Sequence, residues 1–228
     1  MVEIKNLTKR YGNQLAVDHI SFTVKQGEIL GFLGPNGAGK STTMNILTGY
    51  LSATSGEVTI DGHDILDDPV AAKKKIGYLP EHPPLYMDMT VREYLDFVYD
   101  LKKVEEDREA HIGKICEAVR ITDVQNRLIS NLSKGYKQRV GLAQAMVGNP
   151  EVLILDEPTV GLDPKQIIEI RSVIKQLGRE HTVILSSHIL QEVNAICERV
   201  IIINKGRLVA SDTPENLGKS ISNENKFQ

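Results

Sequence analysis

The chain has 228 residues, of which 41% are hydrophobic and 25% are charged, and its formal net charge is -3. These values are ordinary for a globular protein, and the length allows one large domain or one domain with an insertion. The slight negative charge gives no reason to expect a nucleic acid partner, because such a partner usually requires a basic face.

Neither a membrane span nor a leader is predicted. The longest apolar runs, at 152–155 and 200–203, have the length of buried strands and fall far short of the roughly 18 residues that cross a bilayer. The N-terminus begins with a strand-like pattern and lacks the order of a signal peptide. Cys116 and Cys197 lie far apart without metal-ligand spacing, so we expect reduced thiols. We therefore expect a cytoplasmic protein that would reach a membrane only by docking on a partner.

The first part of the chain is predicted to consist of strands and turns around one helix. A turn signal lies at 11–13, Gly49 ends the helix, and Asp61-Gly62 is a dipeptide typical of hairpins. The predicted elements are strands around 2–7, 20–24, 28–33 and 58–60 and a helix at about 40–47.

Residues from about 90 to 148 follow a helical pattern. Thr90 and Glu93 form a capping box ahead of a periodic apolar run. Two further helices are predicted at about 105–119 and 133–147.

After residue 150, strands alternate again with helices. Asp163 is expected to cap a helix that has Pro164 at its first position. The predicted elements are strands at 152–155, 182–185 and 200–203 and helices at 164–177 and 189–197. This alternation predicts a parallel sheet with both faces covered, so the chain is an α/β core interrupted by an all-helical insertion.

A glycine-rich loop indicates a nucleotide site. Residues 34–41 read GPNGAGKS, which matches G-x-x-x-x-G-K-[ST] between a predicted strand and a predicted helix. Such a loop turns its backbone N–H groups towards phosphates, with dihedral angles that glycine adopts easily, and the helix adds its positive dipole end. Lys40 can reach the β- and γ-phosphates, and the Ser41 hydroxyl can ligate Mg²⁺.

Two carboxylates follow the buried strand at 152–155. In an open parallel sheet, ligands bind beyond the carboxyl ends of the strands. We expect Asp156 to orient Mg²⁺ and Glu157 to polarise the water that attacks the γ-phosphate, because phosphoryl transfer needs mainly positioning and charge neutralisation. His188 follows a second apolar strand at 183–187, and we therefore expect it near the γ-phosphate.

Residues 132–139 read LSKGYKQR and are similar to the L-S-G-G-Q signature motif of the ATP-binding cassette (ABC) family. This motif lies between the phosphate loop and the acidic pair, which is the order of that family. Tyr11 lies where the family has its adenine-stacking aromatic residue, and 161–163 matches the loop after the acidic pair. His188 matches the switch histidine. The chain therefore resembles this family over essentially its whole length.

The resemblance implies a single ABC ATPase domain with a P-loop NTPase (RecA-like) fold. Its parts would be a parallel-sheet core with an N-terminal antiparallel β subdomain and an inserted all-helical subdomain. The resemblance assigns residues 1–81 and 149–215 to the α/β core with its antiparallel part, 82–148 to the helical subdomain and 216–228 to a polar tail.

The implied function is that of an ATP-binding and hydrolysing subunit of a transporter, peripheral on the cytoplasmic face of the cell membrane. In this family two cassettes face each other head to tail, and each ATP lies between the phosphate loop of one and the signature motif of the other. Ser133 and Gly135 open a helix, so their hydroxyl and N–H groups suit a second anion site. The implied partners are a transmembrane permease subunit and a second cassette, identical or related. The implied cofactors are ATP and Mg²⁺.

The implied site residues divide into three groups. The catalytic residues are Glu157, His188 and Glu81. The metal ligands are Ser41, Glu81 and Asp156. The nucleotide-binding residues are Tyr11, Gly34, Asn36, Gly37, Ala38, Gly39, Lys40, Ser41, Thr42, Ser133, Gly135 and Asp163.

Three positions depart from the family pattern. Glu81 stands where most members have a glutamine that contacts Mg²⁺ and senses the membrane partner. Lys134 and Tyr136 replace a glycine and the glutamine of the signature motif. These variants are similar to bacterial exporter ATPases of drug, lantibiotic and bacitracin resistance, gliding motility and copper-enzyme maturation, which implies export.

Several alternatives are weighed against this interpretation. A regulatory GTPase needs N-K-x-D, and the candidate at 204–207 lacks the aspartate. Chromosome-maintenance ATPases carry long coiled-coil insertions, and translation-associated members carry two cassettes. A soluble cassette ATPase of a cytosolic assembly, such as one for iron–sulfur clusters, stays open, as does a cassette that only binds nucleotide. The loop at 81–87 either lines a groove for a permease helix or packs against its own helical insertion.

Overall fold

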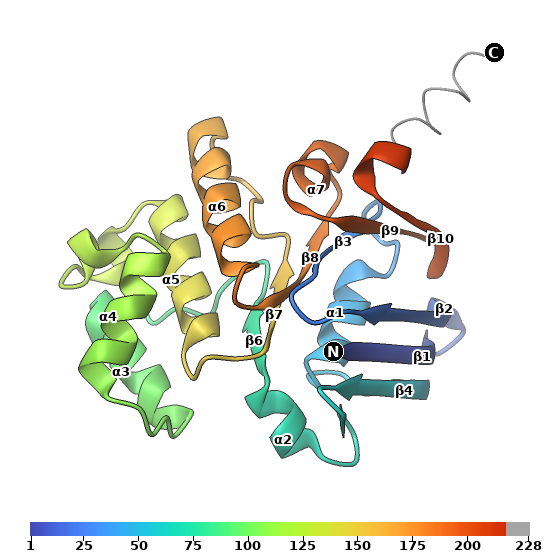
Figure 1. The fold of residues 1–228 in the computed structure, drawn as a ribbon, viewed down its shortest axis with the longest axis horizontal. Helices are drawn as coiled ribbons and strands as arrows, with labels where there is room; N and C mark the ends of the chain where they lie inside the picture. Colours follow the sequence, from blue (N-terminus) through green and yellow to red (C-terminus); the bar gives the residue numbers. More distant parts are fainter. Residues whose placement is uncertain (218–228) are drawn as a thin grey trace.

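The computed structural model describes residues 1–217, and its strands form two sheets (Figure 1). The smaller sheet is antiparallel, in the order β2-β1-β4-β5. The predicted turn between β4 and β5 is confirmed, because Asp61 and Gly62 both have a positive φ, of 49° and 82°. Its strands are β1 (Val2–Tyr11), β2 (Gln14–Val24), β4 (Ser55–Ile60) and β5 (His63–Asp64).

The larger sheet has the order β10-β9-β3-β8-β7-β6 and is parallel except for its edge strand β10. Every residue of β3, β7 and β8 is buried, as the apolar runs predict. Strands β6 and β10 were not predicted. The strands are β3 (Ile29–Leu33), β6 (Ile76–Leu79), β7 (Val152–Asp156), β8 (Thr182–Ser187), β9 (Arg199–Asn204) and β10 (Arg207–Asp212).

Seven α-helices are described, and side-chain caps begin several of them. The Thr90 capping box is present, and the carboxylate of Asp163 accepts from the Gln166 N–H at 2.9 Å. Asp107 caps the second helix of the insertion, which therefore begins later than predicted. The helices are α1 (Lys40–Leu47), α2 (Pro69–Lys74), α3 (Val91–Leu101), α4 (Arg108–Ala118), α5 (Lys134–Met146), α6 (Pro164–Leu177) and α7 (Leu190–Ile196).

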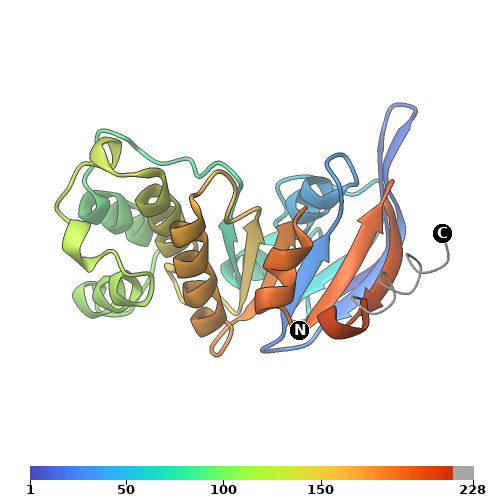
Figure 2. The ribbon, with the colours of Figure 1, turned by 90° about the horizontal axis from the view of Figure 1, so that it is seen from above.

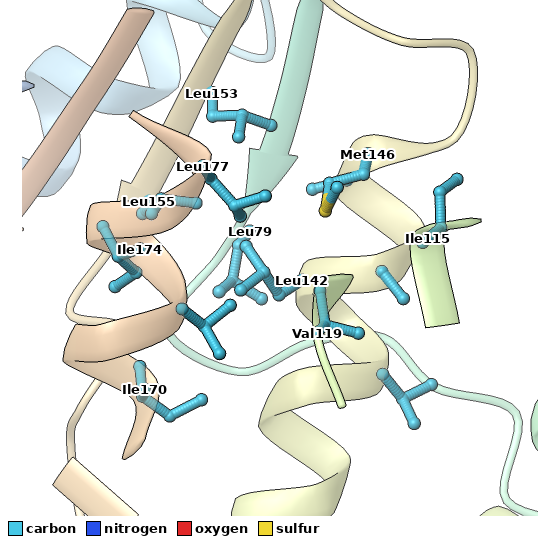
Figure 3. Packing of buried hydrophobic residues seen from close by; sticks show 14 of the residues in the cluster. Leu79, Ile115, Val119, Leu142, Met146, Leu153, Leu155, Ile170, Ile174 and Leu177 are labelled. Atoms are coloured by element: carbon cyan, nitrogen blue, oxygen red, sulfur yellow. The ribbon is translucent and has the colours of Figure 1, made fainter. Parts of the chain in front are cut away.

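The larger sheet separates two hydrophobic clusters. Along β3, Ile29 and Leu33 belong to one cluster and Leu30 and Phe32 to the other, because successive side chains of a strand point to opposite faces. The first cluster packs the sheet against α6, α7 and the insertion, and Figure 3 shows its side chains meeting between α4, α5, α6 and the sheet. The second lies against α1, α2 and the antiparallel sheet.

Helices α3, α4 and α5 gather at one end of the molecule, and the antiparallel strands lie at the other (Figures 1 and 2). Among residues 1–217, no helix is long and apolar enough to cross a membrane. Most of the expected polar tail, residues 218–228, lies outside the described residues.

Candidate functional site

The phosphate loop joins the carboxyl end of β3 to α1. The ammonium group of Lys40 is buried and donates to the carbonyl oxygens of Gly34 and Pro35, at 2.8 and 3.3 Å. Gly39 caps α1 with a φ of 107°, and a Cβ there would lie 2.6 Å from the Ala16 oxygen. Because Gly39 has no side chain, no side-chain cap occupies the first N–H groups of α1, and such N–H groups suit an anion.

The two carboxylates stand at the end of β7, beside the loop. Ser186 of the neighbouring strand β8 donates from its hydroxyl to Asp156 Oδ1 at 2.5 Å. The same hydroxyl accepts from the Glu157 N–H at 3.0 Å. Glu157 Oε1 lies 3.4 Å from Lys40 Nζ, and both side chains are almost fully buried. The strand pairing thus holds the acidic pair against the phosphate loop.

His188 completes this group from the end of β8. Its Nδ1 lies 2.9 Å from Glu157 Oε2, and because a carboxylate only accepts, Nδ1 carries the hydrogen. The imidazole is more exposed than Glu157, with 39% of the side chain accessible. Lys40, Glu157 and His188 therefore form one polar chain that leads from the buried loop towards solvent.

A pocket of about 560 Å³ opens over this chain of residues. It brings together ten of the residues predicted from the sequence. Tyr11 closes one side, 48% exposed, with Lys9 Nζ 5.2 Å from its ring centre. The ten are Tyr11, Asn36, Gly37, Gly39, Lys40, Ser41, Thr42, Glu81, Glu157 and His188.

Six residues of the pocket wall were not predicted. The hairpin β1–β2 supplies three of them, and the turn between β9 and β10 supplies Lys205 and Gly206. The Gly206 N–H donates to the Ala38 oxygen at 2.9 Å, which ties this turn to the phosphate loop. These contacts arise from the packing of the two sheets, and a glycine-containing turn was the signal available in the sequence. The six are Gln14, Leu15, Ala16, Val160, Lys205 and Gly206.

The expected metal ligands meet in an adjoining pocket of about 620 Å³, whose wall includes Ser41, Glu81 and Asp156. One hydroxyl and two carboxylates fit Mg²⁺, which prefers hard oxygen ligands. Tyr78 lines the same pocket and donates from its hydroxyl to Asn45 at 3.2 Å. Burial, with a smaller effect of the Asp156 carboxylate, raises the pKa of Tyr78.

The part of the 560 Å³ pocket wall that the structure describes does not include five of the predicted nucleotide-binding residues. Gly34 and Ala38 are buried in the loop itself. Ser133 caps α5 by accepting from the Tyr136 N–H at 3.4 Å, and Gly135 packs against the Gln166 side chain. Asp163 caps α6. These last three residues lie outside the pocket that their own chain forms.

Residues 17–160 match the profile of a family described as ABC transporter. The ABC transporter ATP-binding protein YhcH of Bacillus subtilis is 42% identical over 92% of this chain and 68% of its own length. The bacitracin transport ATP-binding protein BcrA of Bacillus licheniformis is 39% identical over 100% of this chain and 74% of its own length. Two solved structures of the bacterial ABC transporter cassette MJ0796 are similar, one dimeric and one dimeric in a post-hydrolysis state with ADP and Pi. Each gives a TM-score of 0.83 at 28% identity and covers 94% of this chain and 99% of the other.

Proposed function

This chain belongs to the ABC transporter family as an ATP-binding, ATP-hydrolysing subunit, and from this premise we propose that two copies enclose ATP between them to drive a transmembrane exporter. The observation that carries the proposal is one pocket in which the phosphate loop, Glu157 and His188 meet. Among the described residues the signature-motif residues Ser133 and Gly135 are missing from its wall. Each copy would therefore need the other to complete its site.

The N-terminus of α5 is suited to close the nucleotide site of a second copy. Ser133 begins this 13-residue helix, and Gly135 follows in its first turn. Free N–H groups and the helix dipole at such an end favour phosphate oxygens. We assign Ser133 and Gly135 to the γ-phosphate of the nucleotide held by the opposite phosphate loop, and Asp163 to the same interface.

Glu157 is suited to act as the general base. Its two oxygens contact Lys40 and His188, so the carboxylate is held while one face remains directed at the pocket. A water beside Glu157 would pass its proton to the carboxylate as it attacks the γ-phosphate. We assign Lys40 to the β- and γ-phosphates. We also assign His188 to the γ-phosphate, to which Nε2 would donate in the doubly protonated ring, the form in which both ring nitrogens are donors. Tyr11 would stack on the adenine.

Ser41, Asp156 and Glu81 would hold Mg²⁺. The chemistry that this ion supplies when bound is neutralisation of negative charge on the phosphates. Glu81 carries one negative charge that the glutamine of the family pattern lacks. The Ser186 hydroxyl, which donates to Asp156, would orient that carboxylate towards the ion.

The test is Glu157→Gln, which keeps the shape of the side chain and removes the base. We expect ATP hydrolysis to fall about 100-fold or more while ATP still binds. Mg-ATP should convert this variant into a dimer, measured by sedimentation together with phosphate release. Lys40→Ala is the matched comparison, because it should lose ATP binding itself. Hydrolysis near the wild-type rate in Glu157→Gln would refute the assigned base.

Besides the expected metal ligands, the wall of the 620 Å³ pocket has apolar and aromatic residues, and we propose that these residues contact the permease. The wall combines Pro80 and Pro84 with the rings of Tyr78 and Tyr50, and Tyr50 is 84% exposed. Apolar and aromatic side chains in a groove suit an amphipathic helix, and Glu81 lines both this pocket and the 560 Å³ pocket. This arrangement supports a peripheral location on the cytoplasmic face of the membrane.

Co-purification tests the permease assignment. We expect the intact protein to co-purify with a polytopic membrane protein, and Tyr50→Asp to weaken that association while the isolated chain keeps its ATPase rate. Purification with soluble partners alone would instead favour a cytosolic assembly ATPase.

A further inference from the structure

Glu192 is a buried carboxylate outside the nucleotide pocket, in the first turn of α7, with 3% of the residue exposed. Its Oε2 accepts from the hydroxyl of Thr159 at 2.7 Å and from the hydroxyl of Ser187 at 2.8 Å. Its Oε1 lies 3.8 Å from a guanidinium nitrogen of Arg171 on α6. A buried charge is unfavourable without such partners, and here two hydroxyl groups share one oxygen.

The two hydroxyl groups belong to the two segments that carry the proposed chemistry. Thr159 lies two residues after Glu157, and Ser187 directly precedes His188. The Ser187 side chain also accepts from the Ile189 N–H at 3.1 Å, so it fixes the backbone on both sides of His188. One carboxylate therefore joins the segment of the base to the segment of the histidine.

The same connection extends to the phosphate loop. The carbonyl oxygen of Ser187 accepts from the N–H of Gly34, the first residue of the loop, at 3.3 Å. A shift of Ser187 would thus displace both His188 and the phosphate loop. Small displacements of reacting groups have large effects on rate, with about 100-fold lost for a misplacement of ~1 Å.

We propose that Glu192 is a positioning residue that holds Glu157 and His188 in the relative arrangement that ATP hydrolysis requires. The inference rests on the roles proposed above for these two residues. Glu192 contacts neither residue directly and acts through Thr159 and Ser187. Its removal should change the rate of the chemical step more than the affinity for ATP.

Glu192→Gln tests this directly, because it keeps the size of the side chain and removes the charge. An amide cannot offer two acceptor oxygens, so either the hydroxyl groups or Arg171 must face an N–H group. We expect kcat to fall 10- to 100-fold, with the Kd for ATP, measured separately by equilibrium binding, changed by less than about twofold.

Glu28→Gln is the matched control for loss of a buried carboxylate. Glu28 is 8% exposed and accepts from Arg199 Nε at 2.7 Å, but it lies at the end of β3 away from the phosphate loop. This change should lower the unfolding temperature and leave kcat unchanged. If Glu192→Gln and Glu28→Gln lower stability alike and both keep the wild-type kcat, Glu192 is only structural and the proposal fails.

Milder changes guard against misfolding of the Glu192 variant. Thr159→Val removes one of the two hydroxyl groups and should lower kcat, and Thr159→Ser should restore it relative to valine. Equal rates for valine and serine would overturn the proposal.

A double variant separates this inference from the proposed function. Glu192→Gln should lower the residual rate of Glu157→Gln by a smaller factor than it lowers the wild-type rate, because one of the two groups that it positions is gone. Full activity of Glu157→Gln would refute the proposed base, whereas an inactive Glu157→Gln beside a fully active Glu192→Gln would refute only the role of Glu192.

Discussion

Glu157 adopts a φ of 48°, in the left-handed region that residues other than glycine rarely enter. Such a conformation costs about 1 kcal/mol or more, and it persists only where contacts with the surrounding structure hold the residue in place. Here the N–H of Glu157 donates to Ser186, and its carboxylate contacts Lys40 and His188. Backbone strain therefore lies on the residue that we assign as the base.

Tyr11 is the residue that we propose stacks on the adenine, and its substitution tests that role. Its ring lines the pocket, and base–aromatic stacking contributes about 1–3 kcal/mol. We expect Tyr11→Ala to raise the Kd for ATP about 5- to 10-fold, measured by equilibrium binding, and Tyr11→Phe to keep it near the wild-type value. Unchanged affinity in Tyr11→Ala would show that the adenine lies elsewhere.

A site residue could be predicted where the sequence beside it carries the signal, and could not where its role depends on contacts between distant segments. Glu157 stands out in the sequence because an apolar strand precedes it, and His188 for the same reason. The bridging role of Ser186 could not be predicted, because it depends on the register in which Asp156 of β7 faces Ser186 of β8. The contact of Glu192 with Thr159 likewise joins residues that are 33 positions apart in the chain.

The close packing of α5 on β6 requires a residue without a side chain at one position of the strand. A Cβ added at Gly77 of β6 would lie 2.2 Å from the carbonyl oxygen of Ala145. No flexible side chain can give way there, because the neighbour is backbone. Only a residue without a side chain allows this close approach of helix and strand.

Gly77→Ala should therefore lower the free energy of unfolding by roughly 1–3 kcal/mol. Gly113→Ala is the matched control, because Gly113 lies within α4 with nothing within 4 Å of the added Cβ. It should stabilise the protein by about 0.5–1 kcal/mol, since alanine favours helices over glycine. Urea unfolding of both variants measures the difference, and equal effects would contradict it.

Elements with a strong local signal were predicted with small errors at their ends. Thr90 and Asp163 begin α3 and α6 where their capping side chains predict. The second helix of the insertion begins at Arg108, three residues later than predicted, because Asp107 caps it. Strand β6 was missed because it has only four residues, Gly77 among them, and its burial comes from β7 and α5.

At the scale of the whole molecule, we propose that residues 82–148 act as a helical subdomain on the α/β core at 1–81 and 149–215. Lys102, at the end of α3, links α3 to the end of α5 within this subdomain, just before the chain re-enters the α/β core. Its ammonium group donates to the carbonyl oxygens of Ala145 and Val147, at 3.4 and 2.6 Å. These carbonyls end α5, where a cation is favourable.

Burial lowers the pKa of Lys102 to about 8, whereas lysine in an unfolded chain titrates near 10.4. Between these values the unfolded chain binds more protons, so the free energy of unfolding rises with pH. Below about pH 8 the contribution is constant, because both states are protonated. The free energy of unfolding of the wild type relative to Lys102→Met should increase by about 1–2 kcal/mol between pH 7.5 and 9.5, measured by urea unfolding. A difference that does not change with pH would contradict the lowered pKa.

The position of β3 at the centre of the larger sheet has a consequence during synthesis. Both of its neighbours, β8 and β9, come much later in the chain. At about 5–20 residues per second, a ribosome needs roughly 7–30 s to add the ~150 residues between β3 and β8. The first hairpin can pair in that time, but β3 must wait without a neighbouring strand on either edge. We therefore expect the nascent chain to recruit chaperones at this strand until β8 emerges.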